Sequence, residues 1–313
     1  MMFSGVQRKK QWKVKGGKWK DRWNVWLEGL IWGVSFHFEL STFYFRSSAD
    51  ILPAMHDLKS MLEVASEAAY LGGKRTLAYF NAGVTVETKA DASPVTVADR
   101  ESELAIRARI RASYPEHSIL GEEGGLETGN PDFKWIIDPL DGTKTFVRGV
   151  PLYGVLVGLE IEGEVRVGAM YLPAMNEMIA AATGLGCHWN GRPARVSKTN
   201  TLEQSTILYT SSQSARARGP AFDTLVNRAN VVRGWGDCYG YALVATGRAD
   251  VMLDAGMNPW DCAPILPILE ESGGRFTDWQ GEHTIYGDDG FGTNGALHET
   301  VLEILKDTPK LSQ

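Results

Sequence analysis

The stretch Trp-Ile-Ile-Asp-Pro-Leu-Asp-Gly-Thr-Lys-Thr-Phe-Val-Arg, residues 135–148, decides the fold of this chain. Its apolar start, Trp-Ile-Ile, predicts a buried strand. Pro139 cannot continue a central strand, so we expect the strand to end at Asp138. The Gly-Thr pair that follows predicts a turn leading into the start of a helix.

Two carboxylates, those of Asp138 and Asp141, therefore stand at a strand end, beside the free N–H groups of a helix start. Hard oxygen ligands suit Mg2+, and the N–H groups at a helix start suit phosphate. The alternative is a turn with two solvated Asp residues, because Asp, Pro and Gly are ordinary turn residues. The stretch alone leaves both interpretations open.

Length and composition set the broad class of the protein. The chain has 313 residues, which is enough for one large domain or two modest ones with a real core. A net charge of −6 gives no global sign of nucleic-acid binding. Three Cys residues, Cys187, Cys238 and Cys262, are odd in number and far apart. This pattern argues against a disulfide framework or a zinc site and favours a reducing compartment, so we expect a cytoplasmic protein.

Residues 1–50 differ in character from the rest. Residues 1–48 hold nine Lys or Arg and three Asp or Glu, a charge of +6, so residues 49–313 carry −12. The aromatic run from Trp23 to Phe45 contains charged residues, which makes it a poor membrane span, and neither a signal peptide nor a transit peptide fits. A basic arm that binds a membrane or nucleic acid is one interpretation. We expect a poorly ordered extension.

From residue 51 the sequence predicts a single layered domain, 51–313. The first half, 51–197, is predicted to be α+β, with helices near 53–80 and 96–113, a short strand at 118–121, and antiparallel strands at 155–160, 164–171 and 177–181. Residues 184–191 are predicted to be a hairpin turn. The second half, 198–313, is predicted to be α/β, with strands near 206–209, 231–233, 251–253 and 275–277 and helices near 221–228, 239–246, 259–271 and 297–305.

Acidic residues recur at four places: Asp99, Glu122 with Glu123, Asp138 with Asp141, and Asp261. Each has a purely structural interpretation. The first fits a capping box opened by a Thr three residues earlier, the second a solvated loop, and the last the start of a helix opened by a Pro. Taken singly, none of them establishes a functional site.

Together, these residues resemble the inositol monophosphatase family. The motifs are Lys89 with Val95-Thr-Val-Ala-Asp99, Gly121-Glu-Glu123, residues 135–143 and Trp260-Asp261, in the family's order and spacing across residues 51–313. The resemblance implies an α/β protein with the layered αβαβα sugar-phosphatase fold. It also implies a Mg2+-dependent phosphomonoesterase that uses two or three ions.

The same resemblance implies a set of metal ligands. Glu122, Asp138 and the Leu140 carbonyl would hold one Mg2+; Asp138, Asp141 and Asp261 would hold a second; a third, weaker ion would share Glu122. Adjacent cations can lower the pKa of a water molecule, screen phosphate charge and stabilise the leaving oxygen.

Further residues would serve catalysis on the same grounds. Asp99 would accept a hydrogen bond from Thr143, whose hydroxyl would orient the attacking water together with Glu122. The N–H groups of Gly142 and Thr143 would bind phosphate oxygens. In-line attack by water needs no covalent phosphoenzyme, and the sequence carries no Gly-x-Ser-x-Gly nucleophile motif.

The segment 234–247 bears on the substrate. Inositol-specific members tend to carry a small, uncharged residue where Asp237 stands, and this version resembles the histidinol-phosphate phosphatase branch. An acid there could pair with the cationic groups of histidinol phosphate. Asp254 is expected in the same wall but discriminates less. The structural alternative for Asp237 is the N-cap of a helix that starts before Tyr239.

Three functions follow, in order of preference. The first is hydrolysis of histidinol phosphate, a step of histidine biosynthesis, and the second is hydrolysis of inositol 1-phosphate or a nucleotide 3′-phosphate by the same chemistry. The third is a non-catalytic binding protein that uses the basic arm; the intact set of acids argues against it. We expect a small phosphate monoester as the partner, neither nucleic acid nor membrane, and a homodimer.

Overall fold

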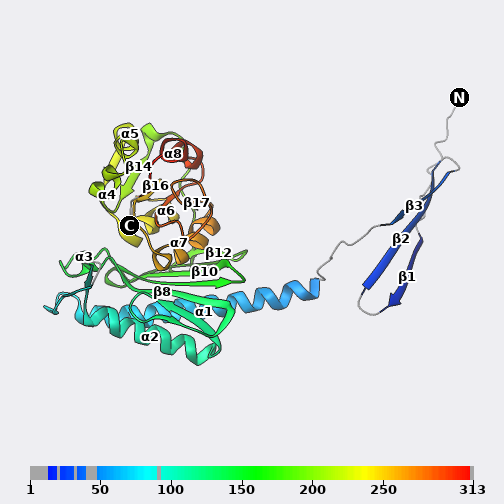
Figure 1. Ribbon diagram of the computed structural model, residues 1–313, viewed down its shortest axis with the longest axis horizontal. Helices are drawn as coiled ribbons and strands as arrows, with labels where there is room; N and C mark the ends of the chain where they lie inside the picture. The colour runs from blue at the N-terminus through cyan, green and yellow to red at the C-terminus, as the bar shows by residue number, and fades with distance from the viewer. Residues whose placement is uncertain (1–12, 20–21, 32–33, 40–47, 90–92, 311–313) are drawn as a thin grey trace. The chain divides into compact units, whose positions relative to one another are not determined.

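The computed structural model describes residues 13–19, 22–31, 34–39, 48–89 and 93–310. The chain divides into two compact units, Met1–Ala54 and Met55–Gln313, and each is described by itself (Figure 1). Of the predicted extension, residues 1–12, 20–21, 32–33 and 40–47 lie outside the described residues. The predicted boundary at residue 50 and the division at 197 stay predictions.

The first unit contains a three-stranded antiparallel sheet in the order β1-β2-β3, formed by β1 (Lys13–Trp19), β2 (Arg22–Ile31) and β3 (Val34–Glu39). No strand was predicted here from the sequence. Val-Ser-Phe-His-Phe-Glu in β3 alternates apolar and polar residues, which is the strand period, and its β-branched and aromatic residues favour that state. The expected poor order of the extension stays a prediction.

The second unit has five layers (Figure 1). Helix α2 (Val97–Ser113) and the part of α1 (Ser48–Tyr79) that follows Ala54 cover the outer face of an eight-stranded sheet. Helices α6 (Asp237–Ala245) and α7 (Pro259–Ser272) lie between that sheet and a five-stranded sheet. Helices α4 (Ser212–Ala217), α5 (Ala221–Arg228) and α8 (His298–Leu305) cover the far side. The predicted αβαβα layering is therefore confirmed.

The eight-stranded sheet has the order β13-β12-β11-β10-β9-β8-β6-β7. Its strands are β6 (His117–Gly121), β7 (Gly125–Glu127), β8 (Asn130–Asp141), β9 (Gly154–Ile161), β10 (Glu164–Leu172), β11 (Glu177–Ala182), β12 (Gly186–Trp189) and β13 (Arg192–Pro193). The three predicted antiparallel strands are confirmed. The predicted turn over 184–191 was wrong in its centre, because β12 pairs there with β11 and buries Cys187.

Strand β8 also differs from its prediction, because it continues through Pro139 to Asp141. Its register against β9 shifts between Asp138 and Asp141. A Pro is tolerated at such a bulge, because the residue there does not need to donate a backbone hydrogen bond to the neighbouring strand. Gly142 follows in the left-handed region, with φ of +83°, and caps the short helix α3 (Thr143–Phe146). The bulge and this turn set both carboxylates at the strand end.

The five-stranded sheet has the order β15-β14-β16-β18-β17, and a separate two-stranded sheet precedes α2. The strands are β14 (Thr206–Tyr209), β15 (Val231–Arg233), β16 (Val251–Asp254), β17 (Arg275–Thr277) and β18 (Gly290–Thr293), with β4 (Glu87–Thr88) and β5 (Pro94–Val95) forming the small sheet. The four predicted strands of this half are confirmed. Strand β18 and helix α4 were not predicted.

Helix α7 packs closely on the sheet where two strands carry glycine. A Cβ added at Gly168 of β10 would lie 2.2 Å from the Pro264 carbonyl oxygen, and one at Gly158 of β9 would lie 2.8 Å from Ala263 Cβ. These glycines let the helix backbone approach the strands closely. As a result, the first turn of α7, which carries Asp261, lies against the end of β8.

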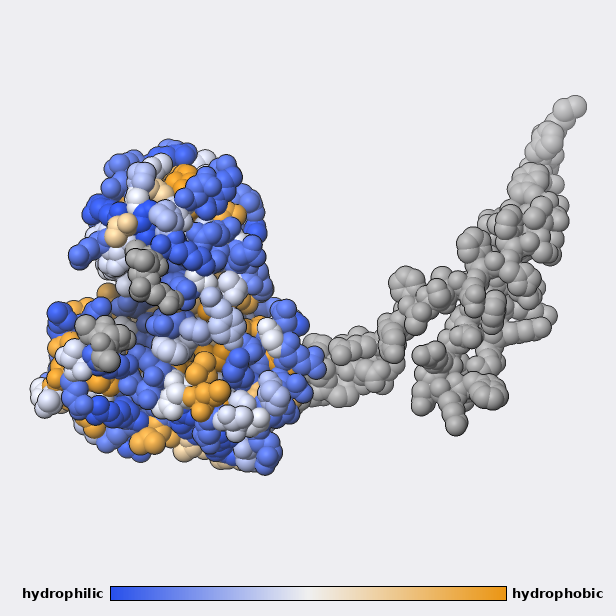
Figure 2. All heavy atoms as spheres, in the orientation of Figure 1, coloured by the Kyte–Doolittle hydropathy of each residue, from blue (hydrophilic) through white to orange (hydrophobic). Residues whose placement is uncertain are grey.

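The face of the second unit shown in Figure 2 is mostly hydrophilic, with hydrophobic side chains in small separate groups. Such scattered groups are ordinary on protein surfaces. Among the described residues, no helix is both long enough and apolar enough to span a bilayer.

Candidate active site

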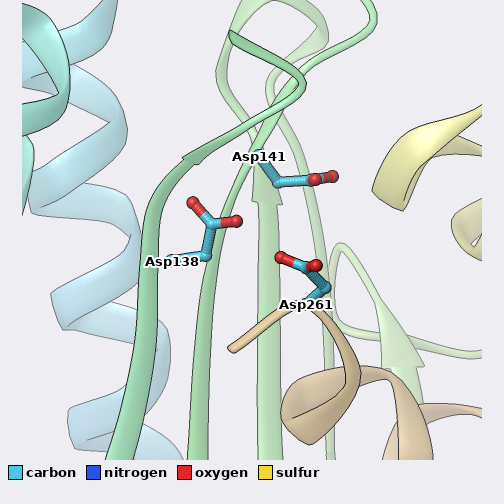
Figure 3. Close-up of side chains that lie close together, drawn as sticks. All are labelled: Asp138, Asp141 and Asp261. Atoms are coloured by element: carbon cyan, nitrogen blue, oxygen red, sulfur yellow. The ribbon is translucent and has the colours of Figure 1, made fainter. Parts of the chain in front are cut away.

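Three acids from two elements meet at one point. Asp138 and Asp141 come from the end of β8, and Asp261 from the first turn of α7; their side chains lie close together (Figure 3). One carboxylate oxygen of each lies within 4.8 Å of the others. Among the residues that the structure describes, no Lys or Arg forms an ion pair with any of the three.

The electrostatics of this cluster favour a bound cation. Burial raises the pKa of Asp138 well above its ordinary value, and the charges of Glu122, Asp141 and Asp261 raise it further. Burial likewise raises the pKa of Asp261 to about 7. Like charges this close disfavour ionisation, and a divalent ion among them would reverse that effect. An all-oxygen donor set of this kind fits a hard cation.

Each of these acids is oriented by one backbone N–H group. Asp138 Oδ1 accepts from the Leu140 N–H at 2.9 Å, and Asp141 Oδ2 accepts from the Cys238 N–H at 2.6 Å. Asp261 Oδ2 accepts from the N–H of the N-cap residue of α7 at 2.7 Å, within a capping box. The structural interpretation of Asp261 is therefore correct, and its position in the acidic cluster is an additional property.

Asp99 and Thr143 are brought together as the resemblance implies. The Thr143 hydroxyl lies 3.3 Å from Asp99 Oδ1 and 3.0 Å from the Leu140 carbonyl oxygen. A hydroxyl has one proton, so it donates to only one of these acceptors at a time. Asp99 is fully buried, and its other oxygen accepts from the N–H and hydroxyl of Thr96, forming the predicted capping box.

The side chains of the Glu122–Glu123 loop are ion-paired and only partly exposed, so a purely solvated loop does not describe them. The Lys89 ammonium lies 2.7 Å from Glu122 Oε1 and 2.5 Å from Glu123 Oε1, and the two Glu side chains are 19% and 14% exposed. The Glu122 N–H donates to the Ile137 carbonyl at 3.3 Å, one residue before Asp138. The loop thus holds Glu122 beside the acidic cluster, where burial raises the pKa of its carboxyl group and Lys89 opposes that rise.

Gly142 lies at the junction of the acidic cluster and a neighbouring cavity. A Cβ there would lie 3.1 Å from Asp237 Oδ2, and the positive φ also favours glycine. The first N–H groups of a helix have no intrahelical partner, so those at the start of α3 are available to an anion.

The cavity has a volume of about 300 Å³. Its lining combines polar and apolar groups: Lys144, Thr145, Arg148, Val150, Leu152, Thr210, Gly234, Gly236 and Asp237. Burial raises the pKa of Asp141 and the Asp237 charge raises it further, so the cavity wall and the acidic cluster are electrostatic neighbours. A cavity of this size accommodates a small organic group attached to a phosphate.

Asp237 stands at the first position of α6, and the alternative that it is an N-cap was wrong. Gly236 is the N-cap, and Asp237 has a φ of +52°, a region that Asp tolerates but rarely populates. Its N–H donates to the Thr210 hydroxyl oxygen at 2.8 Å, and its Oδ2 accepts from the Thr145 hydroxyl at 3.2 Å. These contacts turn the carboxylate toward the cavity.

Asp254 lies one layer behind the cavity wall. It is buried at the end of β16 and accepts the Thr210 hydroxyl proton at 2.7 Å, but it does not line the cavity. Two contributors, Thr210 and the Cys238 N–H, were not predicted from the sequence. The position of Thr210, directly after a parallel strand, was the available signal, because ligand-binding residues gather at such strand ends.

Comparison with known proteins identifies the family. The sequence profile of the inositol monophosphatase family matches residues 57–310. The chain belongs to the inositol monophosphatase family. It is therefore a phosphatase that acts on phosphate monoesters, and the predicted resemblance is confirmed. This family is metal-dependent, and the acidic cluster offers suitable donors.

Three relatives of this inositol monophosphatase family member show how far the likeness extends. A histidinol-phosphatase from Chlorobaculum parvum is 42% identical over 246 residues, which cover 77% of this chain and 95% of that protein. A fructose-1,6-bisphosphatase/inositol-1-monophosphatase from Aquifex aeolicus is 34% identical over 259 residues, covering 80% and 97%. The solved structure of an inositol monophosphatase from Anabaena (Nostoc) has a TM-score of 0.70 at 32% identity, covering 82% and 98%.

Proposed function

We propose that this family member hydrolyses histidinol phosphate to histidinol and phosphate with Mg2+ as its cofactor. The observation that carries the proposal is the Asp237 carboxylate in the wall of the cavity beside the acidic cluster. A carboxylate in the wall favours a leaving group with an ammonium and an imidazole over one with only hydroxyl groups. The relative named histidinol-phosphatase supports the same substrate.

The donor set supports Mg2+, which is coordinated by oxygen. We propose that Asp138, Asp141 and Asp261, together with Glu122 and the Leu140 carbonyl, hold two or three ions. When bound, these ions supply positive charge that lowers the pKa of a water molecule and neutralises the phosphate.

The residues around the ions would position the reacting groups. Asp99 and the Leu140 carbonyl are the two acceptors available to the Thr143 hydroxyl, and that hydroxyl with Glu122 would orient the attacking water. The N–H groups of Gly142 and Thr143, at the start of α3, bind the phosphate oxygens. Attack by water in line with the leaving oxygen then requires no nucleophile from the protein.

Asp237 would bind the organic part of the substrate directly. Its backbone is held by the Thr210 hydroxyl, which in turn donates to Asp254. In this proposal Asp254 contributes to substrate binding through Thr210 and Asp237 rather than by contact. The buried Asp254 keeps Thr210 oriented, so the carboxylate that meets the substrate is preorganised.

The second candidate is hydrolysis of inositol 1-phosphate. Lys144 and Arg148 also line the cavity, so its wall is not purely anionic, and a relative at 34% identity carries the inositol-1-monophosphatase name. The same metal site would serve both substrates. A cytoplasmic location, a homodimer, and the absence of nucleic-acid and membrane partners remain part of the proposal.

The deciding experiment measures phosphate release from histidinol phosphate and from inositol 1-phosphate, each with Mg2+ and with a chelator. We expect a higher kcat/KM for histidinol phosphate and activity that disappears with the chelator. A preference for inositol 1-phosphate would replace the substrate in this proposal. Full activity in the presence of the chelator would overturn the metal role.

A further inference from the structure

A buried acid on α2 holds the backbone of the loop that carries Glu122. Glu103 Oε2 accepts from the Glu123 N–H, and its Oε1 accepts from the Gly124 N–H, both at 2.8 Å. The Glu103 side chain is 3% exposed. Both oxygens of one carboxylate are thus committed to the two residues that follow Glu122, and hydrogen bonds to an ionised acceptor are among the stronger ones in proteins.

Arg107, one turn later on α2, completes this contact. Its Nε lies 2.7 Å from Glu103 Oε1, and its Nη2 donates to the Gly125 carbonyl at 2.7 Å. The pair therefore engages both N–H and carbonyl groups of residues 123–125. A buried carboxylate costs free energy unless it is paired and hydrogen-bonded, and here both conditions are met.

The two glycines that flank the acidic pair are explained by this contact. A Cβ at Gly121 would lie 2.5 Å from Glu103 Oε1, and a Cβ at Gly124 would lie at the same 2.5 Å. Any larger residue at either position would displace the carboxylate from the loop. The Gly-Glu-Glu-Gly sequence is therefore fitted to Glu103 from both sides.

We propose that Glu103, supported by Arg107, is a positioning residue that fixes Glu122 for binding a divalent cation. The inference rests on the proposed function, because it requires Glu122 to be a ligand of that cation. The Glu122 side chain is paired with Lys89, whereas the backbone that carries it is held at residues 123–125 by Glu103 and Arg107. Holding the backbone in advance removes an ordering cost that the cation would otherwise have to offset.

The test is calorimetric titration of the full chain with Mg2+ alone, in the absence of substrate. Glu103→Gln keeps the shape of the side chain but loses its charge and one acceptor oxygen. Residues that orient metal ligands typically change affinity by about 10–100-fold, and we expect a loss in that range. The matched control is Glu127→Gln, which removes an exposed partner of Arg107 at 3.3 Å and should leave Mg2+ affinity unchanged.

Gly124→Ala disturbs the contact between Glu103 and the loop from the side of the loop. It provides a second test if Glu103→Gln fails to fold. The added methyl group should weaken Mg2+ binding in the same direction, because it displaces the Glu103 carboxylate. Wild-type Mg2+ affinity in a folded Gly124→Ala or Glu103→Gln protein, even with a lower Tm, would overturn the positioning role. A wild-type chain that binds no Mg2+ would overturn the proposed metal site and this inference with it.

Discussion

Asp138 is central to the acidic cluster, because its carboxylate interacts with the charges of Glu122, Asp141 and Asp261. We predict that Asp138→Asn lowers turnover by orders of magnitude, since the charge that would bridge two cations is removed. The fold should survive, because Asn can still accept the Leu140 N–H and relieves like-charge repulsion. Steady-state kinetics at saturating Mg2+ and a metal-free melting curve measure both effects. Near-normal turnover at saturating Mg2+ would contradict the bridging role.

Asp237→Asn tests substrate choice while preserving shape. Asn tolerates the positive φ at this position, so the backbone should be unchanged. A charge-assisted hydrogen bond contributes about 1.5–3 kcal/mol, so kcat/KM for histidinol phosphate should fall roughly ten- to hundredfold. Hydrolysis of an aryl phosphate whose leaving group carries no charge is the internal control, and its kcat/KM should barely change. Equal losses on both substrates would make Asp237 structural, and no loss on either would favour inositol 1-phosphate.

The sequence could supply the identity of the acids but not the contacts that orient them. The family motifs located Asp99, Glu122 and the β8 acids, because their order along the chain is itself the signal. Hydrogen bonds run from Asp254 through Thr210 to Asp237. They join the end of β16, the residue after β14 and the start of α6, which are distant in sequence. No local pattern encodes such a contact, since it arises only when the layers pack.

The contact between α7 and β10 helps to set the position of Asp261, because α7 carries that residue. Gly168→Ala would place a methyl group 2.2 Å from the Pro264 carbonyl oxygen, so the helix that carries Asp261 must shift. Overpacking of this kind costs about 1–3 kcal/mol, and we expect a lower Tm together with weaker Mg2+ binding. Gly256→Ala, where nothing lies within 4 Å of the added Cβ, is the control. An unchanged Tm for Gly168→Ala would show that the sheet and helix can separate at little cost.

Elements with strong periodicity were predictable, and those defined by packing were not. The long helices α1 and α2 and the meander strands β9 to β11 were found from their apolar spacing. Strand β18, Gly-Phe-Gly-Thr, has low intrinsic strand propensity, and its Gly292 lies against Leu269 of α7 at a distance that excludes a side chain. The continuation of β8 past Pro139 likewise depends on a bulge against β9 that the sequence alone does not reveal.

At the scale of the whole molecule, the first unit should be dispensable for catalysis. The family match begins at residue 57, and every proposed site residue lies in the second unit. We predict that deleting residues 1–48 leaves kcat and KM for histidinol phosphate nearly unchanged. Salt-sensitive binding to nucleic acid or anionic vesicles, measured for both forms, tests the basic-arm alternative. A folded but inactive truncated protein would show that the first unit completes the site.

The acidic cluster also links the stability of the second unit to pH. Burial raises the pKa of Asp261 to about 7, far above its unfolded value of 3.8, so the native state holds a proton that the unfolded state releases. Over this interval the unfolded chain binds fewer protons, and the free energy of unfolding must fall as pH rises. His298 acts in the opposite direction, because burial lowers its pKa to about 4. Burial also raises the pKa values of Asp138, Asp141 and Glu122, which titrate together with Asp261. Wild-type melting curves alone would therefore mix several effects.

The difference between wild type and Asp261→Asn measures what this acid contributes to the joint titration of the acidic cluster. Without metal, the variant should gain stability over wild type as pH rises from about 4 to about 7, because Asn has no proton to lose; each ~1 kcal/mol corresponds to roughly 2–4 °C in Tm. With Mg2+, the order should reverse at pH 7, since a cation that binds only the native state stabilises wild type more. Melting curves at pH 5 and pH 7, with chelator and with Mg2+, measure both differences. If the Tm difference in chelator is independent of pH, the pKa of Asp261 is not raised in the metal-free protein, and the prediction is wrong.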